Sequence, residues 1–325
     1  MLTKAKVLLP SFMARYDKVI QMLSHVAYIE YIDKKKYQDQ LTDVEGMVGG
    51  RINEKVLQKA FRLKVVARYG VGYDDCDVEA MTRHEVYLCH TPGVLSNSVA
   101  DMTLALLLAC NRKIVQADRY VREKWEDRAP GYPSHGLDLE GKTLGIIGLG
   151  RIGLEVAKRC VKGFEMDLIY FDIMRNRKAE KELGAKFMTL EEVMNKSDFI
   201  SVNVALTSRT RGIIGAKQLR MMKNTAYIIN TSRGPVIDQA SLVEVLSEGA
   251  IAGAGLDVFE KEPIRKNNPL LKLQNVVLSP HIGSVTEEAR EAMAICDAKN
   301  IVAVLKGEIP PPNVVPEQRG MIFKR

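Results

Sequence analysis

The sequence contains no long hydrophobic run. Its longest apolar stretch, residues 104–110, is far shorter than the roughly 20 residues that a membrane-spanning helix needs, so we expect a buried helix segment there. The first apolar segment, residues 7–10, is too short for a secretory signal and is typical of a first β-strand. We therefore expect no membrane partner and a cytoplasmic protein.

Cysteine is scarce, and the five cysteines are widely separated. Their number is odd, no two form a C-x-x-C pair, and no histidine lies at the spacing of a zinc ligand. This pattern argues against a disulfide framework and against a structural zinc. We therefore expect no metal site.

Charge of one sign is in small excess. Lys and Arg number 47 against 40 Asp and Glu, a net charge of +7 that would suit an anionic ligand or equally a solubilising surface. The basic run at residues 34–36 has no interleaved aromatic residues beyond Tyr31 and Tyr37. We expect a solvated helix end or loop there, and no nucleic-acid partner.

The sequence does contain short apolar runs that alternate with segments of helical period. This alternation is typical of βαβ units, and 325 residues are enough for two cores, because single cores rarely grow beyond about 250 residues. We predict an α/β protein with two doubly wound parallel sheets. Strands are expected over 7–9, 46–50, 65–68, 143–148, 168–172, 199–204, 226–230, 253–257 and 276–278.

Three further segments bear on the organisation of the chain. Residues 98 to about 125 have a continuous helical pattern that is apolar on more than one face, which predicts cover by another domain or by a second subunit in a homodimer. Residues 128–141 are rich in Gly, Pro, Ser and His and predict a loop between structural units. The proline run 310–312 predicts a stiff extended tail.

A G-x-G-x-x-G motif follows the expected strand 143–147 and opens a helical segment. Its glycines allow a tight turn, close approach of a pyrophosphate and close helix packing, while the helix N-terminus supplies N–H groups to the phosphates. The motif therefore predicts a dinucleotide site made by Gly148, Gly150, Arg151, Ile152 and Gly153. Its late position indicates that another unit occupies the first hundred residues.

Asp172 ends the next expected strand, 19 residues after Gly153. A carboxylate at this spacing accepts hydrogen bonds from the adenosine ribose of NAD and repels the 2′-phosphate of NADP, so we expect NAD as cofactor. Arg175, Arg177 and Lys178 lie just downstream and could surround a phosphate if the loop folds back. Replacing Asp172 by Ser is therefore predicted to narrow or invert the preference.

Three polar residues lie just beyond later strands: Arg233 in N-T-S-R-G, Glu262 in E-K-E-P, and His281 in S-P-H-I-G. Taken singly, each is most simply an exposed cap, a surface carboxylate or a turn histidine. Ligands of open α/β sheets bind beyond the carboxyl ends of the strands, so their joint occurrence after a cofactor motif favours an active site instead.

The set GLGRIG, NTSRG, LDVFEKEP and SPHIG resembles the D-isomer-specific 2-hydroxyacid dehydrogenases, and the resemblance extends to RYGVGYD at 68–74 and SVAD at 98–101. Segments 51–57 and 307–311 are similar to those of glyoxylate/hydroxypyruvate reductases. The resemblance implies a flavodoxin-like substrate domain from residues 1–99 and 288–325, and an inserted Rossmann domain at 100–287. It also implies a dimer built partly on the helix after Asn97.

The resemblance gives each polar residue an expected role in reducing a small 2-oxo acid with a nicotinamide. His281 would donate the proton to the carbonyl oxygen, and Glu262 would orient its ring and favour the imidazolium. Arg233 would hold the carboxylate or carbonyl oxygen of the substrate, with backbone N–H groups around Val71 and Gly72 completing the site. The nucleotide contacts would include Thr231 and Asp257, the latter holding the nicotinamide carboxamide.

Two alternatives keep the same motifs. A D-3-phosphoglycerate dehydrogenase is disfavoured because segment 48–50 supplies no positive charge for a substrate phosphate, and because no regulatory domain follows Arg325. A non-catalytic NAD-sensing scaffold of the C-terminal-binding co-repressor type is disfavoured because the sequence lacks an extended tail.

Overall fold

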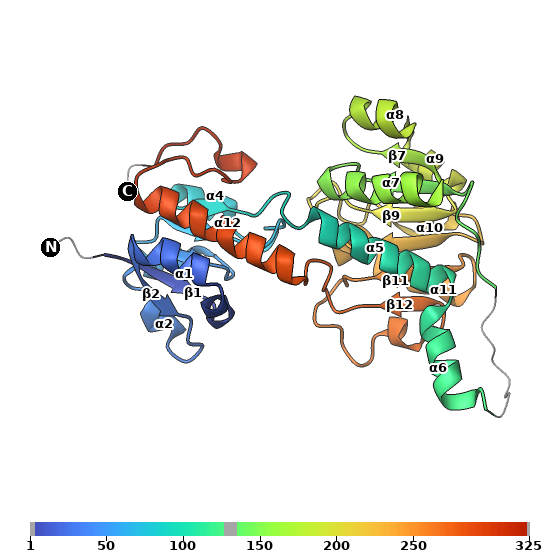
Figure 1. Ribbon diagram of the computed structural model, residues 1–325, viewed down its shortest axis with the longest axis horizontal. Helices are drawn as coiled ribbons and strands as arrows, with labels where there is room; N and C mark the ends of the chain where they lie inside the picture. Colours follow the sequence, from blue (N-terminus) through green and yellow to red (C-terminus); the bar gives the residue numbers. More distant parts are fainter. Residues whose placement is uncertain (1–3, 127–134, 324–325) are drawn as a thin grey trace. The chain divides into compact units, whose positions relative to one another are not determined.

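The chain builds two parallel β-sheets in a computed structural model that describes residues 4–126 and 135–323. One unit comprises Met1–Leu95 with Val285–Arg325, and the other comprises Ser96–Ser284 (Figure 1). The expected limits at 99/100 and 287/288 differ by a few residues. Limits there would cut helices α5 (Ser96–Asn111) and α12 (Glu287–Leu305), each of which stays whole within one unit.

The first unit has a five-stranded sheet in the order β2-β1-β3-β4-β5, which is the flavodoxin-like order. All neighbours are parallel, with Val7 paired to Ile29 on one side and to Gly46 on the other. The strands are β1 (Ala5–Leu9), β2 (Ala27–Tyr31), β3 (Val44–Val48), β4 (Val65–Ala67) and β5 (Tyr87–Cys89).

Helices cover both faces of this sheet because each turns an apolar stripe toward it. Buried side chains of α1 (Asp17–Ser24) and α12 pack on one face, and those of α3 (Glu54–Lys59) and α4 (Val78–Arg83) pack on the other. The remaining short elements are η1 (Ser11–Arg15), α2 (Tyr37–Gln40) and η4 (Pro316–Gln318).

The proline-rich C-terminal segment packs against strand β5, so the expectation of a plain extended tail is wrong. Val314 forms an antiparallel bridge with Cys89, and the fully buried Gln318 accepts a hydrogen bond from the Leu88 N–H at 2.8 Å. Edge strands leave unpaired backbone groups, and this segment satisfies some of those of β5.

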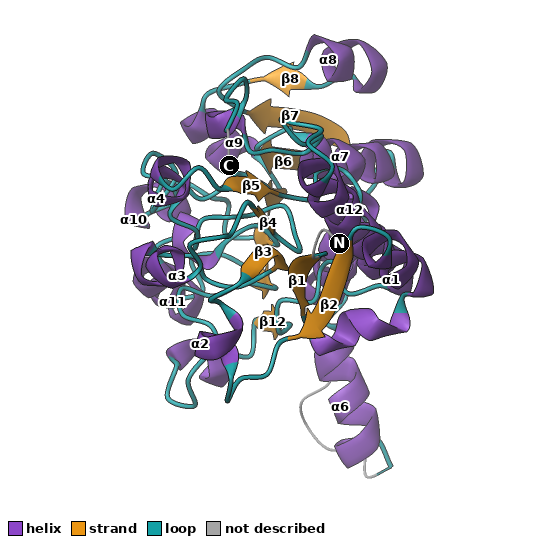
Figure 2. Ribbon diagram, turned by 90° about the vertical axis from the view of Figure 1, so that its left-hand side faces the viewer, coloured by secondary structure: helices purple, strands orange, loops and turns teal. Residues whose placement is uncertain are grey.

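The second unit has a seven-stranded parallel sheet in the order β12-β11-β10-β9-β6-β7-β8. Figure 2 shows β6, β7 and β8 at one edge of this sheet. Its first six strands in chain order have the Rossmann arrangement, which confirms the predicted fold class. The strands are β6 (Thr143–Ile147), β7 (Asp167–Phe171), β8 (Lys186–Phe187), β9 (Phe199–Val202), β10 (Tyr227–Asn230), β11 (Gly253–Leu256) and β12 (Val276–Leu278).

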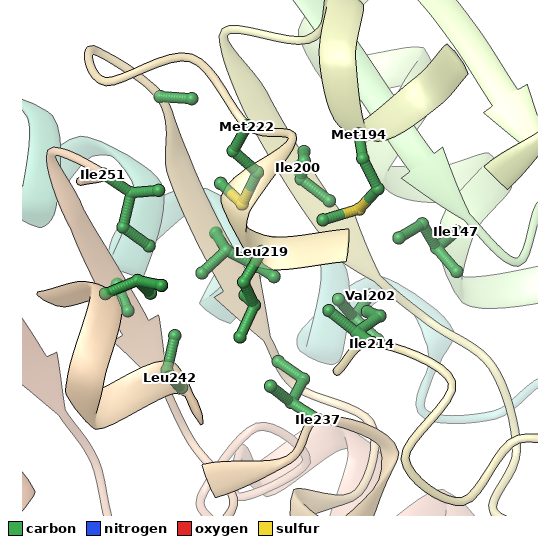
Figure 3. Packing of buried hydrophobic residues seen from close by; sticks show 14 of the residues in the cluster. Ile147, Met194, Ile200, Val202, Ile214, Leu219, Met222, Ile237, Leu242 and Ile251 are labelled. Carbon is green, nitrogen blue, oxygen red and sulfur yellow. The ribbon is translucent and has the colours of Figure 1, made fainter. Parts of the chain in front are cut away.

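This sheet also has helices on both faces. One face packs against α5, α7 (Arg151–Phe164) and α8 (Arg177–Leu183). The other packs against α9 (Leu190–Lys196), α10 (Ala216–Arg220) and α11 (Gln239–Ser247), and Figure 3 shows Met194, Leu219 and Leu242 of these helices in one buried cluster with strand residues Ile200 and Val202. The short helices η2 (Gly234–Val236) and η3 (Pro269–Lys272) lie in loops after the strands.

The expected continuous helix over 98–125 is broken into α5 and α6 (Ile114–Lys124). Lys113 has a left-handed backbone (φ 53°), and the Asn111 side chain binds both the N–H and the carbonyl of Leu137. The predicted loop 128–141 lies partly outside the described residues. Its described part, residues 135–141, belongs to the second unit and does not separate the two units.

Two further findings concern membranes and metals. No helix within residues 4–126 and 135–323 is long and apolar enough to span a bilayer. Within the same residues, no three His, Cys, Asp or Glu side chains gather as a metal site would require.

Candidate active site

The three glycines of the motif differ in what surrounds them. Gly148 has a φ of 93°, and a Cβ there would lie 2.9 Å from the backbone of Asn203, while a Cβ on Gly153 would overlap the Gly148 carbonyl. A Cβ on Gly150 would meet no described atom within 4 Å. The protein's own packing thus requires two glycines, and the third faces open space, as close approach of a pyrophosphate requires.

Gly150 is also the N-cap of α7, and it makes no side-chain capping bond. The first turn of this 14-residue helix, which begins at Arg151 and Ile152, contains no acidic residue. Uncapped N–H groups and the positive end of the helix dipole favour an anion, so the loop fits a dinucleotide.

Asp172 lies directly beyond β7 and contacts the glycine loop. Its Oδ2 accepts a hydrogen bond from the Leu149 N–H at 2.8 Å, while Oδ1 has only a long contact, 3.4 Å, to the Met174 N–H. The carboxylate therefore lies beside the loop, with acceptor capacity left for a ribose hydroxyl.

His281 and Glu262 form a direct pair, with His281 Nδ1 2.7 Å from Glu262 Oε2. The Phe259 N–H donates to Glu262 Oε1 at 2.9 Å, so both oxygens of the carboxylate are bound. Partial burial raises the pKa of Glu262, but the bonds from His281 and Phe259 and the charges of His281 and Arg233 outweigh burial and lower it overall. Glu262 is therefore a stable anion beside the imidazole.

Hydrogen bonds to a buried carboxylate fix the turn that contains His281. Asp257, only 1% exposed, accepts bonds from Ser279 Oγ at 2.6 Å, from the Ile282 N–H at 2.9 Å and from the Gly283 N–H at 2.7 Å. His281 itself has a positive φ of 55°, which a non-glycine residue adopts only when its surroundings enforce it.

This anchoring of the turn by Asp257 is the feature that sequence reasoning missed. The family aspartate was expected to face the nicotinamide, and that role stays a prediction. A buried acid at a strand end, two dozen residues before a Ser-Pro-His turn, is the signal that could have indicated the contact.

Arg233 lies on the loop after β10, and Asn230 shapes that loop. The Asn230 amide donates to the Arg233 carbonyl at 3.0 Å, and its oxygen accepts from the Ser232 N–H and hydroxyl at 3.0 and 2.8 Å. A Cβ on Gly234 would overlap the Phe259 carbonyl, so this loop packs directly against the segment leading to Glu262. Arg233, Glu262 and His281 thus come together at one end of the sheet.

The remaining predicted residues lie elsewhere. Thr231 Oγ1 is 2.8 Å from Thr103 Oγ1 on α5, which fixes the Thr231 side chain at the start of the Arg233 loop. Val71 and Gly72 belong to the first unit, in the loop after β4. There the Val71 carbonyl is 3.0 Å from a ring nitrogen of His90, and the Gly72 carbonyl accepts from Arg68 Nε at 3.3 Å.

Comparisons with known proteins show which family the chain belongs to. Residues 104–283 match the model of the D-isomer specific 2-hydroxyacid dehydrogenase, NAD binding domain. A glyoxylate reductase of Korarchaeum cryptofilum is 48% identical over 86% of this chain and 85% of its own length. That of Thermococcus litoralis is 50% identical over 82% of this chain and 81% of its own.

A solved structure extends the likeness to the whole fold. The NADPH-dependent glyoxylate/hydroxypyruvate reductase of Sinorhizobium meliloti, in complex with NADP and malonate, superposes with a TM-score of 0.85 at 31% identity, covering 97% of this chain and 98% of that one. The chain belongs to the family of D-isomer-specific 2-hydroxyacid dehydrogenases and is an oxidoreductase.

Proposed function

We propose that the protein is an NAD-dependent reductase of small 2-oxo acids of the glyoxylate and hydroxypyruvate class, forming the D-2-hydroxy acid where the product is chiral. The observation that carries the proposal is the 2.7 Å pair of His281 and Glu262 beside the Arg233 loop, in a unit that also holds a glycine loop fitted to a dinucleotide. When bound, the nicotinamide supplies the hydride for the carbonyl carbon.

The proton would come from His281. Its Nδ1 is engaged by Glu262, which leaves Nε2 as the atom that donates to the carbonyl oxygen of the substrate. The lowered pKa of Glu262 keeps that carboxylate ionised near neutrality, so a negative charge faces Nδ1 of the ring that would give up the proton.

Arg233 would hold the carboxylate or the carbonyl oxygen of the substrate through its planar guanidinium. One guanidinium nitrogen, Nη1, binds the Ser232 carbonyl at 2.8 Å, and Asn230 fixes the backbone on both sides. We further propose that backbone N–H groups at Val71 and Gly72 complete the substrate site.

For the cofactor we propose NAD, bound by the glycine loop, by Asp172 at the ribose, and by Thr231 and Asp257 toward the nicotinamide. The S. meliloti reductase with NADP shows that proteins of this fold also use the phosphorylated cofactor. The choice in this chain is assigned to Asp172, because its carboxylate beside the loop would repel a 2′-phosphate.

We propose that the protein forms a homodimer whose interface covers α6. This helix has no buried residue and projects from its unit in Figure 1. The apolar side chains of Ile114, Val121 and Trp125 at this helix are 50–59% exposed, and an exposed apolar surface of this kind marks an interaction site.

The direct test is spectrophotometric. NADH consumption is followed with glyoxylate, hydroxypyruvate, pyruvate and 3-phosphohydroxypyruvate as substrates, and the glycerate formed from hydroxypyruvate is resolved by chirality. We expect the first two to have the highest kcat/KM and the glycerate to be the D isomer. Preference for the phosphorylated substrate would indicate a phosphoglycerate dehydrogenase, and no reaction with any substrate would overturn the proposal.

A further inference from the structure

The loop between β7 and α8 is closed against the glycine loop. Both backbone groups of Leu149 are bound from this loop, the N–H by Asp172 at 2.8 Å and the carbonyl by Asn176 Nδ2 at 3.3 Å. Asn176 also caps α8, because its Oδ1 accepts from the Ala179 N–H. These bonds therefore fix the backbone of the loop next to the proposed ribose site, and with it the positions from which its side chains extend.

Arg175 is the nearest cation after Asp172 in the sequence, and one edge and one face of its guanidinium are already bound. Nε and Nη2 donate to the two oxygens of Glu180 at 3.0 and 3.1 Å, a bidentate pair. The same guanidinium lies over the Phe187 ring of β8, 5.6 Å from its centre. Bidentate pairing and stacking are the strongest ways in which a protein fixes an arginine.

Glu180 is itself held in place. The Tyr170 hydroxyl donates to its Oε1 at 2.8 Å and accepts from the Asn176 N–H at 2.8 Å. The Glu180 side chain is only 17% exposed. The bonds from Arg175 and Tyr170 lower its pKa, so the pair stays charged at neutral pH.

The two other cations downstream of Asp172 also have acidic partners. Arg177 Nη1 lies 3.5 Å from Glu180 Oε2, and Lys178 Nζ lies 3.9 Å from Glu182 Oε1. Both side chains are 74% exposed, so these pairs are weaker than the Arg175 pair.

We infer that Glu180 is a specificity-determining residue that, by binding Nε and Nη2 of Arg175, withholds the edge of the guanidinium which would otherwise receive a 2′-phosphate. The inference rests on the proposed cofactor site. It changes the expectation for Asp172→Ser, because that substitution removes a repelling charge while Arg175 remains paired. Two carboxylates, one at the ribose and one behind the nearest arginine, then act together against the phosphorylated cofactor.

The test measures binding of ADP-ribose and 2′-phospho-ADP-ribose by titration calorimetry, so it does not depend on turnover. In an Asp172→Ser background we expect Glu180→Gln to tighten 2′-phospho-ADP-ribose binding about tenfold, since one charge-assisted contact becomes available, with ADP-ribose affinity unchanged. Adding Arg175→Ala should abolish the gain. Glu182→Gln is the matched control, because it removes the same charge from the same helix and leaves the Arg175 pair intact.

A second variant needs no change at Glu180. Arg175→Ala alone should leave the affinity for 2′-phospho-ADP-ribose as it is in the unmodified protein, because Arg175 is already withheld; a clear loss would overturn the inference. An equal gain in Glu182→Gln, a gain that survives Arg175→Ala, or no gain in a folded Glu180→Gln would also overturn it. Failure of the unmodified protein to bind ADP-ribose would instead overturn the proposed cofactor site, and the inference with it.

Discussion

The Asp257 carboxylate accepts a hydrogen bond from the Gly283 N–H at 2.7 Å, although 26 residues separate the two in sequence. With the bonds from Ser279 and Ile282, this contact fixes the turn on which His281 has a positive φ. The position of the proposed proton donor thus depends on a buried acid at the end of β11.

Asp257→Asn should lower both stability and activity. The NH2 of the new amide would replace one acceptor oxygen and face a group that is itself a donor. A buried polar group left unsatisfied in this way costs about 1–3 kcal/mol of stability. We expect a lower Tm and a loss of kcat, with NADH affinity reduced as well if the carboxamide role is correct. Asp238→Asn, which changes an exposed helix cap, is the control and should leave kcat near that of the unmodified enzyme.

Glu262→Gln should move the pH optimum for reduction toward acid. The pKa of this carboxylate is lowered and it is ionised across the neutral range, so the substitution removes a negative charge 2.7 Å from His281 Nδ1, and we expect the alkaline limb of the profile to move to lower pH. The profile of kcat/KM against pH checks this. Glu54→Gln is a matched control, since Glu54 pairs with His84 at 2.8 Å in the other unit; an unchanged profile in Glu262→Gln would show that the pair does not control proton transfer.

Arg233→Lys should lose most of kcat/KM, at least about tenfold, because an ammonium cannot make two parallel bonds to a carboxylate and each charged hydrogen bond contributes about 1.5–3 kcal/mol. Steady-state kinetics with glyoxylate measure the loss. Arg209→Lys, at an exposed arginine of the same unit, should have no effect. Near-full activity in Arg233→Lys would remove this residue from the substrate site.

Sedimentation velocity should show a dimer at micromolar concentration. The exposed apolar residues of α6 are the reason, so Val121→Glu should weaken the association, while Glu123→Gln on the same exposed helix should not. A single species near 36.3 kDa for the unmodified protein would contradict the dimer.

The buried strands and the residues after them could be predicted from sequence, because a central parallel strand has a continuous apolar run with a polar residue at its end. All nine expected strands are present, whereas β2, β5 and β8 were missed. β2 is a partly exposed edge strand containing Glu30, and β8 has only two residues, both exposed, so neither carries that pattern. β5 does carry it, since its three residues are buried and His90 follows them, so this strand was overlooked.

The hydrogen-bond partners of side chains could not be predicted from the sequence, for a different reason. Arg175 and Glu180 are near in sequence, yet only the folded loop decides whether the arginine faces a phosphate or a carboxylate. Lys113 gives no sequence signal for its left-handed backbone, and the nearby Asn111 side chain binds Leu137, 26 residues away, so the helix break was also missed.

We propose that His281 transfers the proton and does not bind the dinucleotide. The most direct measurement combines NADH titration by fluorescence with turnover of glyoxylate in His281→Gln, using His84→Gln, the other His–Glu pair, as the matched control. We expect His281→Gln to bind NADH as the unmodified enzyme does while its turnover is abolished, and we expect His84→Gln to match the unmodified enzyme in both measurements. Retained turnover in His281→Gln, or a parallel loss of NADH affinity, would contradict it.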